Sequence, residues 1–323
     1  MKNETLYNSF LERIAQSIPR KTDVVTILAK MLNLSKDSVY RRLKGEVPFT
    51  FYEVIEISAR LGISLDNLDV NKSSQSKPFT LSLIEYINPV ESDFALMDEM
   101  TAIMKSFRNT SDPEAGEITN ILPQPLYIPY KYVFRFYLFK WNYQSSRSQN
   151  TLPYKEIVIP DKLQKSKEEY LKWAKRLHAD YIFDRQILQY IINDIKYFYY
   201  IGLITVEEIE LIKQDLLKIV DEIDTLTHTG VIKETGKKIN IYISEVNIDT
   251  NYISVSAPDY QLTIIKAFLL NGIASTDKAT FEEVRSWMQS MKQQSVLITR
   301  SNEKERLNYL REQRRIIDGL SGL

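Results

Sequence analysis

A short segment, "SKDSVYRRLKG" from Ser35 to Gly45, gathers several cations between a residue type that starts helices and one that stops them. The segment therefore predicts a short helix. Its charged side chains are Lys36, Arg41, Arg42 and Lys44, opposed by Asp37 alone. Cations presented on one helix can bind phosphate oxygens or the edges of guanine bases. The simpler alternative is a solvated, charged helix surface.

The neighbouring residues explain how such a helix would be held. Ala29 is a small residue that lets two helices approach, "NLS" supplies a tight turn, and Leu34 lies beneath that turn as an apolar plug. Val39 and Leu43 have the spacing of an inward face. The pattern leaves the remaining side chains available outward, although Tyr40 fits packing against the helix that follows equally well: Lys36, Asp37, Ser38, Tyr40, Arg41, Arg42 and Lys44.

This stretch resembles the lambda-repressor-like helix-turn-helix family of bacterial and phage regulators. The resemblance extends from Asp23 to Leu68 and includes Gly45 after the second helix, followed by "VIEISARLGISLDNL". It departs at Asn33, where the family usually has glycine, although asparagine tolerates left-handed backbone angles better than most residues. The resemblance implies a recognition helix over residues 35–45 in the major groove of double-stranded DNA, with the seven outward residues as the contact set.

The apolar spacing predicts two domains. Residues 1–70 form a five-helix module, "NKSSQSKP" (71–78) forms a linker without apolar residues, and residues 79–323 form a larger domain. The larger domain combines long helical patterns with a period-two stretch from Lys238 to Leu270, where "NIDTN" predicts a hairpin turn. The expected fold class is α+β, mostly α, with a small antiparallel sheet.

Several helices are predicted in the larger domain. Residues 91–107, 161–182, 184–202, 205–226, 278–294 and 301–317 have helical patterns, and Thr205 with Glu208 forms a capping box. Residues 132–144 fit either a helix or a strand, and "SVLIT" at 295–299 fits a short strand. The aromatic-rich helices and the 238–270 sheet are the candidates for an interface or an effector pocket.

Composition excludes several classes of function. The chain of 323 residues has no cysteine and only two histidines, His178 and His228, so thiol chemistry and a histidine metal site are not expected. Paired carboxylates at 207–210 and 221–224 suit a charged helix face better than a metal site. Lys plus Arg and Asp plus Glu number 42 each, so nucleic-acid affinity must come from a local patch. No secretion signal or membrane-spanning run is evident, which predicts a cytoplasmic protein.

We therefore expect a bacterial DNA-binding transcriptional regulator rather than an enzyme, with no cofactor and no metal. Single base contacts contribute only about 1–3 kcal/mol each, so a small module is expected to act as a homodimer on two half-sites. The larger domain would dimerise the chain and sense a small-molecule or protein effector. The competing interpretation is an adaptor that uses the helical module to dock another protein.

Overall fold

The computed structural model describes residues 2–18, 24–61, 63, 65, 82–83, 92–110, 112–145, 152–258, 260–266 and 272–322. The chain divides into two compact units, Met1–Thr80 and Leu81–Leu323, and each is described by itself. The predicted linker at 71–78 lies outside the described residues, as does most of the predicted fifth helix of the N-terminal module.

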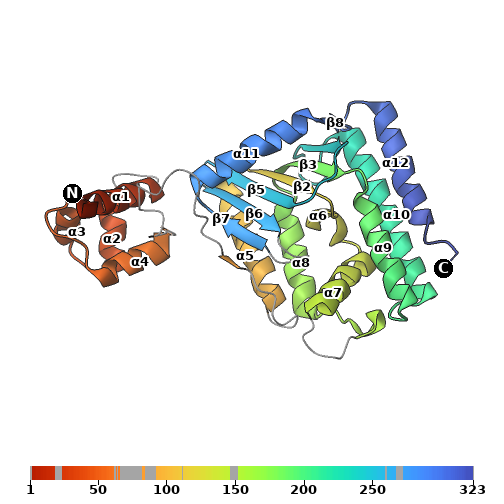
Figure 1. The fold of residues 1–323 in the computed structure, drawn as a ribbon, viewed down its shortest axis with the longest axis horizontal. Helices are drawn as coiled ribbons and strands as arrows, with labels where there is room; N and C mark the ends of the chain where they lie inside the picture. The colour runs from red at the N-terminus through yellow and green to blue at the C-terminus, as the bar shows by residue number, and fades with distance from the viewer. Residues whose placement is uncertain are drawn as a thin grey trace. The chain divides into compact units, whose positions relative to one another are not determined.

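The described secondary structure of the N-terminal unit consists of helices joined by turns (Figure 1). Its helices are α1 (Lys2–Ser17), α2 (Val24–Leu32), α3 (Lys36–Leu43) and α4 (Phe51–Leu61). Each helix contributes to one apolar core, in which Ile14, Leu28, Val39 and Ile57 are fully buried. The predicted inward face of the basic helix is confirmed, because Val39 is in this core and Leu43 packs against it.

The C-terminal unit is built on one mixed sheet, which in the described residues has eight strands in the order β1-β7-β6-β5-β2-β3-β4-β8. The strands are β1 (Ser82–Leu83), β2 (Glu114–Thr119), β3 (His178–Asp184), β4 (Ile239–Ser244), β5 (Asn251–Ala257), β6 (Tyr260–Lys266), β7 (Gly272–Ser275) and β8 (Ser295–Leu297). Strands β2, β3 and β4 are parallel, and the other pairings are antiparallel. The expectation of a small antiparallel sheet is therefore wrong, because the sheet is large and its centre is parallel.

Helices cover both faces of this sheet. Those described are α5 (Ser92–Ser106), α6 (Gln124–Tyr127), α7 (Lys131–Ser145), α8 (Asp161–Ala174), α9 (Ile187–Tyr200), α10 (Val206–Thr229), α11 (Lys278–Gln293) and α12 (Glu303–Asp318), with 3-10 turns η2 (Phe107–Asn109) and η3 (Tyr154–Glu156). Helix α11 packs on β5, β6 and β8, while α10 packs on β4 and is flanked by α7 and α12 (Figure 1).

Two sequence predictions about this unit are wrong for a physical reason. The predicted "NIDTN" hairpin does not form, because β4 pairs with β3 and β8, whereas β5 pairs with β2 and β6. The predicted helix at 161–182 ends at Ala174, and its last residues belong to β3. Both errors come from strand partners that are distant in the sequence and leave no local signal, parallel partners for β3 and β4 and antiparallel β2 for β5.

Other predicted elements are confirmed. Residues 132–144 are helical within α7, and Phe134, Tyr137 and Trp141 on that helix are buried. The capping box at the start of α10 is present, with Thr205 and Glu208 bonding each other's backbone N–H groups. The short strand predicted in "SVLIT" is β8.

Candidate nucleic-acid interface

The turn between α2 and α3 has the geometry that a helix-turn-helix requires. Asn33 adopts a left-handed backbone with φ of 52°, which ends α2. The N–H of Leu34 then bonds the carbonyl of Ala29 at 3.0 Å. Ala29 is buried and Leu34 packs against the same core, as the sequence predicted for the small residue and the plug. Asparagine is one of the few non-glycine residues that accept this conformation, so it can replace the glycine usual in this turn.

Both ends of α3 are capped. The hydroxyl of Ser35 accepts the N–H of Ser38 at 3.2 Å, which satisfies one of the free donors of the first turn. At the other end, Gly45 has φ of 76°, and the N–H of Glu46 bonds the carbonyl of Arg41 at 3.0 Å. A left-handed residue at this position closes the helix and turns the chain away from it. The helix is thus short and fixed at both termini.

One stripe of α3 is exposed to solvent. It consists of Lys36, Asp37, Tyr40, Arg41 and, just past the helix, Lys44. The ammonium of Lys44 lies 4.7 Å from the centre of the Tyr40 ring, and Arg41 pairs with Glu46 at 3.4 Å. An exposed ion pair of this kind contributes at most about 1 kcal/mol, so Arg41 can exchange Glu46 for a phosphate at little cost. The exposed stripe carries three cations and one carboxylate.

The expectation that Arg42 faces outward is wrong. Its side chain is only 16% exposed, and its Nε donates to Glu53 of α4 at 3.0 Å. Its Nη1 also donates to the backbone carbonyl of Ser38 at 3.2 Å. Ser38 is half-buried too, and its hydroxyl lies 2.9 Å from that of Ser35. Arg42 therefore joins α3 to α4, and the exposed stripe is narrower than the sequence predicted.

Glu53 is a structural residue that the sequence reasoning missed. Its carboxylate accepts the N–H of Thr50 at 2.7 Å, while the Thr50 hydroxyl accepts the N–H of Glu53 at 3.4 Å. The signal was present, because Thr50 and Glu53 have the spacing of a capping box. Burial acts to raise the pKa of Glu53, but the Thr50 N–H and the Arg42 guanidinium outweigh it and hold that pKa below its ordinary value.

Tyr7 of α1 braces the end of α3 from the other side. Its hydroxyl accepts the N–H of Phe49 at 2.9 Å and donates to the carbonyl of Arg42 at 3.4 Å. The loop after α3 is thereby tied to both α1 and α4. Since α3 is held through its caps, Val39, Arg42 and Tyr7, its exposed stripe can act as a rigid surface.

Two carboxylates of α10 lie against arginines of α12. Asp221 pairs with Arg314 at 2.8 Å, and Asp224 pairs with Arg306, so these carboxylates bind α10 to α12. Among the described residues, no group of three or more histidine, aspartate or glutamate side chains is arranged to hold a metal ion. In the same part of the chain, no helix has the length and apolarity needed to cross a membrane.

One protein family resembles the part of the chain that contains α2 and α3. Residues 8–103 match the family model of the BetR domain. The BetR domain is a DNA-binding domain of helix-turn-helix type that is associated with regulators. The match begins in α1, passes through α2, α3 and α4, and ends within α5 of the C-terminal unit. No curated protein and no solved structure matches the chain.

Proposed function

We propose that this protein is a sequence-specific DNA-binding transcriptional regulator, in which α3 enters the major groove. The observation that carries the proposal is the exposed stripe of α3, a group of cations on a helix whose opposite side is locked into the core. The BetR match supports a regulatory DNA-binding role for the same residues. We also propose that α2 and α3 are arranged as in lambda-repressor-like regulators.

The exposed residues suggest how the contacts divide. Lys36 and Asp37 lie in the first turn of α3, which in helix-turn-helix proteins is directed toward base edges. Arg41 can reach a guanine or a phosphate, and Lys44, past the helix end, is placed for a phosphate. Arg42 holds the helix in position instead of touching DNA. Because eight helical residues present few contacts, we propose that the chain binds as a homodimer on two half-sites.

The test is selection of bound duplexes from a random DNA pool, followed by affinity measurements on the selected site at several salt concentrations. Replacing Arg41 and Lys44 together by alanine should weaken binding at least tenfold and reduce the salt slope by about 1–2, since each lost phosphate contact lowers it by about 0.9. The control is Arg60→Ala on α4, which removes an equally exposed cation outside α3. Unchanged DNA affinity in the double variant would contradict the proposal that α3 enters the major groove.

A protein-docking adaptor is the second candidate, and one observation favours it. Phe51, Tyr52 and Ile55 of α4 are 72%, 84% and 44% exposed, and the two rings contact each other edge to face. Exposed apolar groups in a cluster often mark a protein contact. If the random pool yields no enriched duplex, while Tyr52→Ala abolishes capture of a protein partner, the adaptor replaces the regulator.

A further inference from the structure

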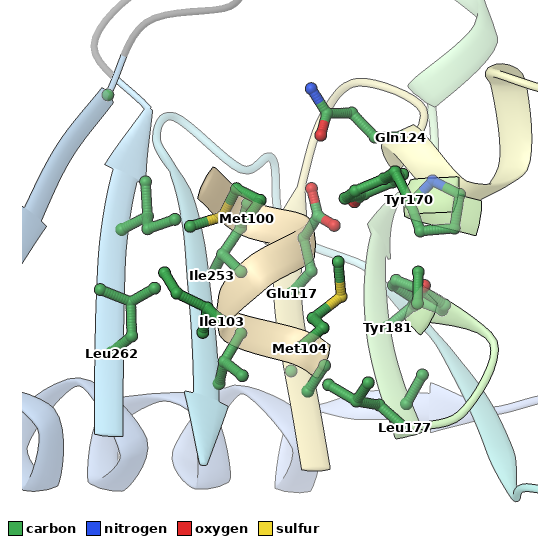
Figure 2. A pocket seen from close by; sticks show the side chains of 18 of the residues that line it. Met100, Ile103, Met104, Glu117, Gln124, Tyr170, Leu177, Tyr181, Ile253 and Leu262 are labelled. Atoms are coloured by element: carbon green, nitrogen blue, oxygen red, sulfur yellow. The ribbon is translucent and has the colours of Figure 1, made fainter. Parts of the chain in front are cut away.

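An apolar cavity of about 130 Å³ lies between α5, α8 and one face of the sheet in the C-terminal unit (Figure 2). Helix α5 contributes Met97, Met100, Ile103 and Met104 to its lining. The strands contribute aliphatic side chains from the face opposite α11: Ala115, Ala179, Ile253, Val255, Leu262 and Ile264. For comparison, an engineered apolar cavity of about 150 Å³ admits benzene. The space therefore suits a ring or short chain of similar size.

Polar groups are concentrated at one part of this lining. Glu117 of β2 and Lys266 of β6 form an ion pair at 2.8 Å, and both side chains are about nine-tenths buried. Tyr170 of α8 and Tyr181 of β3 lie beside Glu117 (Figure 2), and burial raises the pKa of both phenols. Both hydroxyls therefore keep their protons and can donate. Within the described part of the chain, neither hydroxyl has a hydrogen-bond partner.

The charge balance of the lining selects the kind of molecule that fits. Glu117 and Lys266 already neutralise each other, so the described residues that line the cavity leave no unpaired charge for an ion to meet. Bringing a charged group into an apolar space costs free energy unless an opposite charge receives it. A neutral hydroxyl or amide, by contrast, can satisfy the unpartnered hydroxyls of Tyr170 and Tyr181 without that cost.

We propose that this cavity is an effector site for a small uncharged molecule with an apolar body and one hydrogen-bonding head group. The head group bonds the hydroxyls of Tyr170 and Tyr181, and the body lies against the methionines of α5. Methionine side chains adapt their shape readily, which suits a wall that closes on a ligand.

Helix α5 also gives the site a route to regulation. Helix α5 is the first described helix of the C-terminal unit, and the BetR match ends within it. A ligand that changes the packing of α5 acts on a helix that the BetR match includes in part, together with the helices of the N-terminal unit. This regulatory role rests on the proposed function, whereas binding of the molecule does not.

The test uses the full chain and four probes with one shared ring: benzyl alcohol, benzoate, benzylamine and toluene, titrated at neutral pH and followed by NMR. Benzyl alcohol should bind at least tenfold more tightly than benzoate or benzylamine, because only the uncharged head avoids the desolvation cost. Tyr170→Phe combined with Tyr181→Phe should weaken benzyl alcohol roughly tenfold and leave toluene unchanged, because toluene has no head group.

The control variant is Tyr242→Phe, which makes the same change on the α11 face of the sheet. The proposal is overturned if no probe binds, if benzoate matches benzyl alcohol, or if the control weakens binding as much as the double variant. If the double variant fails to fold, Tyr181→Phe alone should give about a threefold loss. DNA affinity is measured separately, without probe. If the chain binds no DNA but still prefers benzyl alcohol among the probes, the proposed regulator is rejected and the proposed ligand site is retained.

Discussion

Arg41 and Arg42 are neighbours in the sequence, but their side chains have opposite environments. Arg41 is about half exposed and pairs weakly with Glu46, whereas Arg42 is covered and bonded to Glu53 and to the Ser38 carbonyl. On a helix, adjacent residues are separated by about 100°, so a one-residue step can move a cation from the surface into an interface. Charge clusters in a sequence therefore overestimate the number of cations available to a ligand.

The Glu53 network predicts how the stability of the N-terminal unit depends on pH. Since its pKa in the folded chain lies below the ordinary value of 4.5, Glu53 stabilises the fold above that pH, and the contribution is lost as the pH falls through the folded-state pKa. As the pH falls through this range, the amide NMR signals of residues 24–61 in the full chain should show progressive unfolding of the N-terminal unit. Glu53→Gln should be less stable at neutral pH and less sensitive to acid. An identical acid response in both chains would contradict this role.

At the scale of elements, two left-handed residues determine the geometry of α3. Asn33 ends α2 and Gly45 ends α3, so the chain reverses at both places without a long loop. The apolar core of the N-terminal unit and the caps at both ends then fix the position of α3. The neighbouring helices add the contacts of Tyr7 and Glu53, which no property of the α3 segment itself reveals.

The turn at Asn33 can be tested by substitution. Asn33→Val should lower the free energy of unfolding of the N-terminal unit by about 1–2 kcal/mol, because a β-branched residue is strained at φ of 52°. Asn33→Gly should be neutral or slightly stabilising, since glycine adopts this conformation freely. Hydrogen-exchange protection of the α2 and α3 amides measures both. Equal protection in the valine and glycine variants would show that the turn is not under this constraint.

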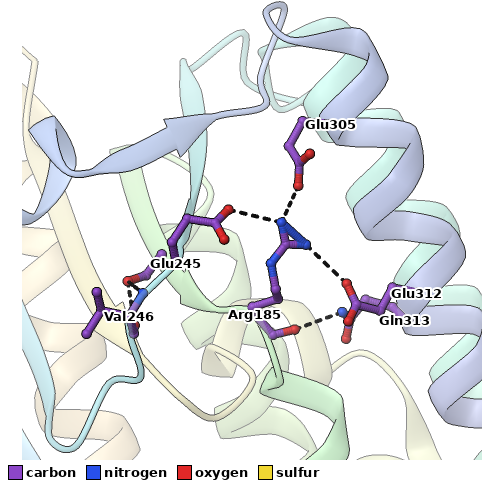
Figure 3. Close-up of polar contacts among 7 residues, drawn as sticks. Arg185, Glu245, Val246, Glu305, Glu312 and Gln313 are labelled. Carbon is purple, nitrogen blue, oxygen red and sulfur yellow. Dashed lines mark hydrogen bonds and ion pairs between the residues drawn. The ribbon is translucent and has the colours of Figure 1, made fainter.

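At the scale of the whole molecule, the C-terminal unit depends on contacts between distant segments. Arg185, just after β3, donates to Glu245 after β4 and to Glu305 and Glu312 of α12 (Figure 3). The carbonyl of Arg185 also accepts a bond from Gln313 at 3.0 Å. One guanidinium thus joins the carboxyl ends of two parallel strands to the last helix of the described chain.

Removing that cation should destabilise the C-terminal unit. Arg185→Met leaves three carboxylates without their shared partner, so we expect a loss of about 1–3 kcal/mol, partly recovered in high salt. Arg314→Met is the control, because its pair with Asp221 is more exposed and should contribute less than about 1 kcal/mol. Urea denaturation followed by tryptophan fluorescence reports on this unit, where all three tryptophans lie. A loss in the control as large as in Arg185→Met would reject the network.

The sequence by itself determined the local features of this protein. Helix periodicity, the caps at Ser35 and Thr205, and the left-handed tolerance of Asn33 depend on residues a few positions apart, and the structure has all of them. Tertiary structure alone decided the parallel strands, the burial of Arg42 and the cavity beneath α5. Each of these brings together residues that are distant along the chain, such as Glu117 and Lys266, whose meeting depends on how the sheet is assembled.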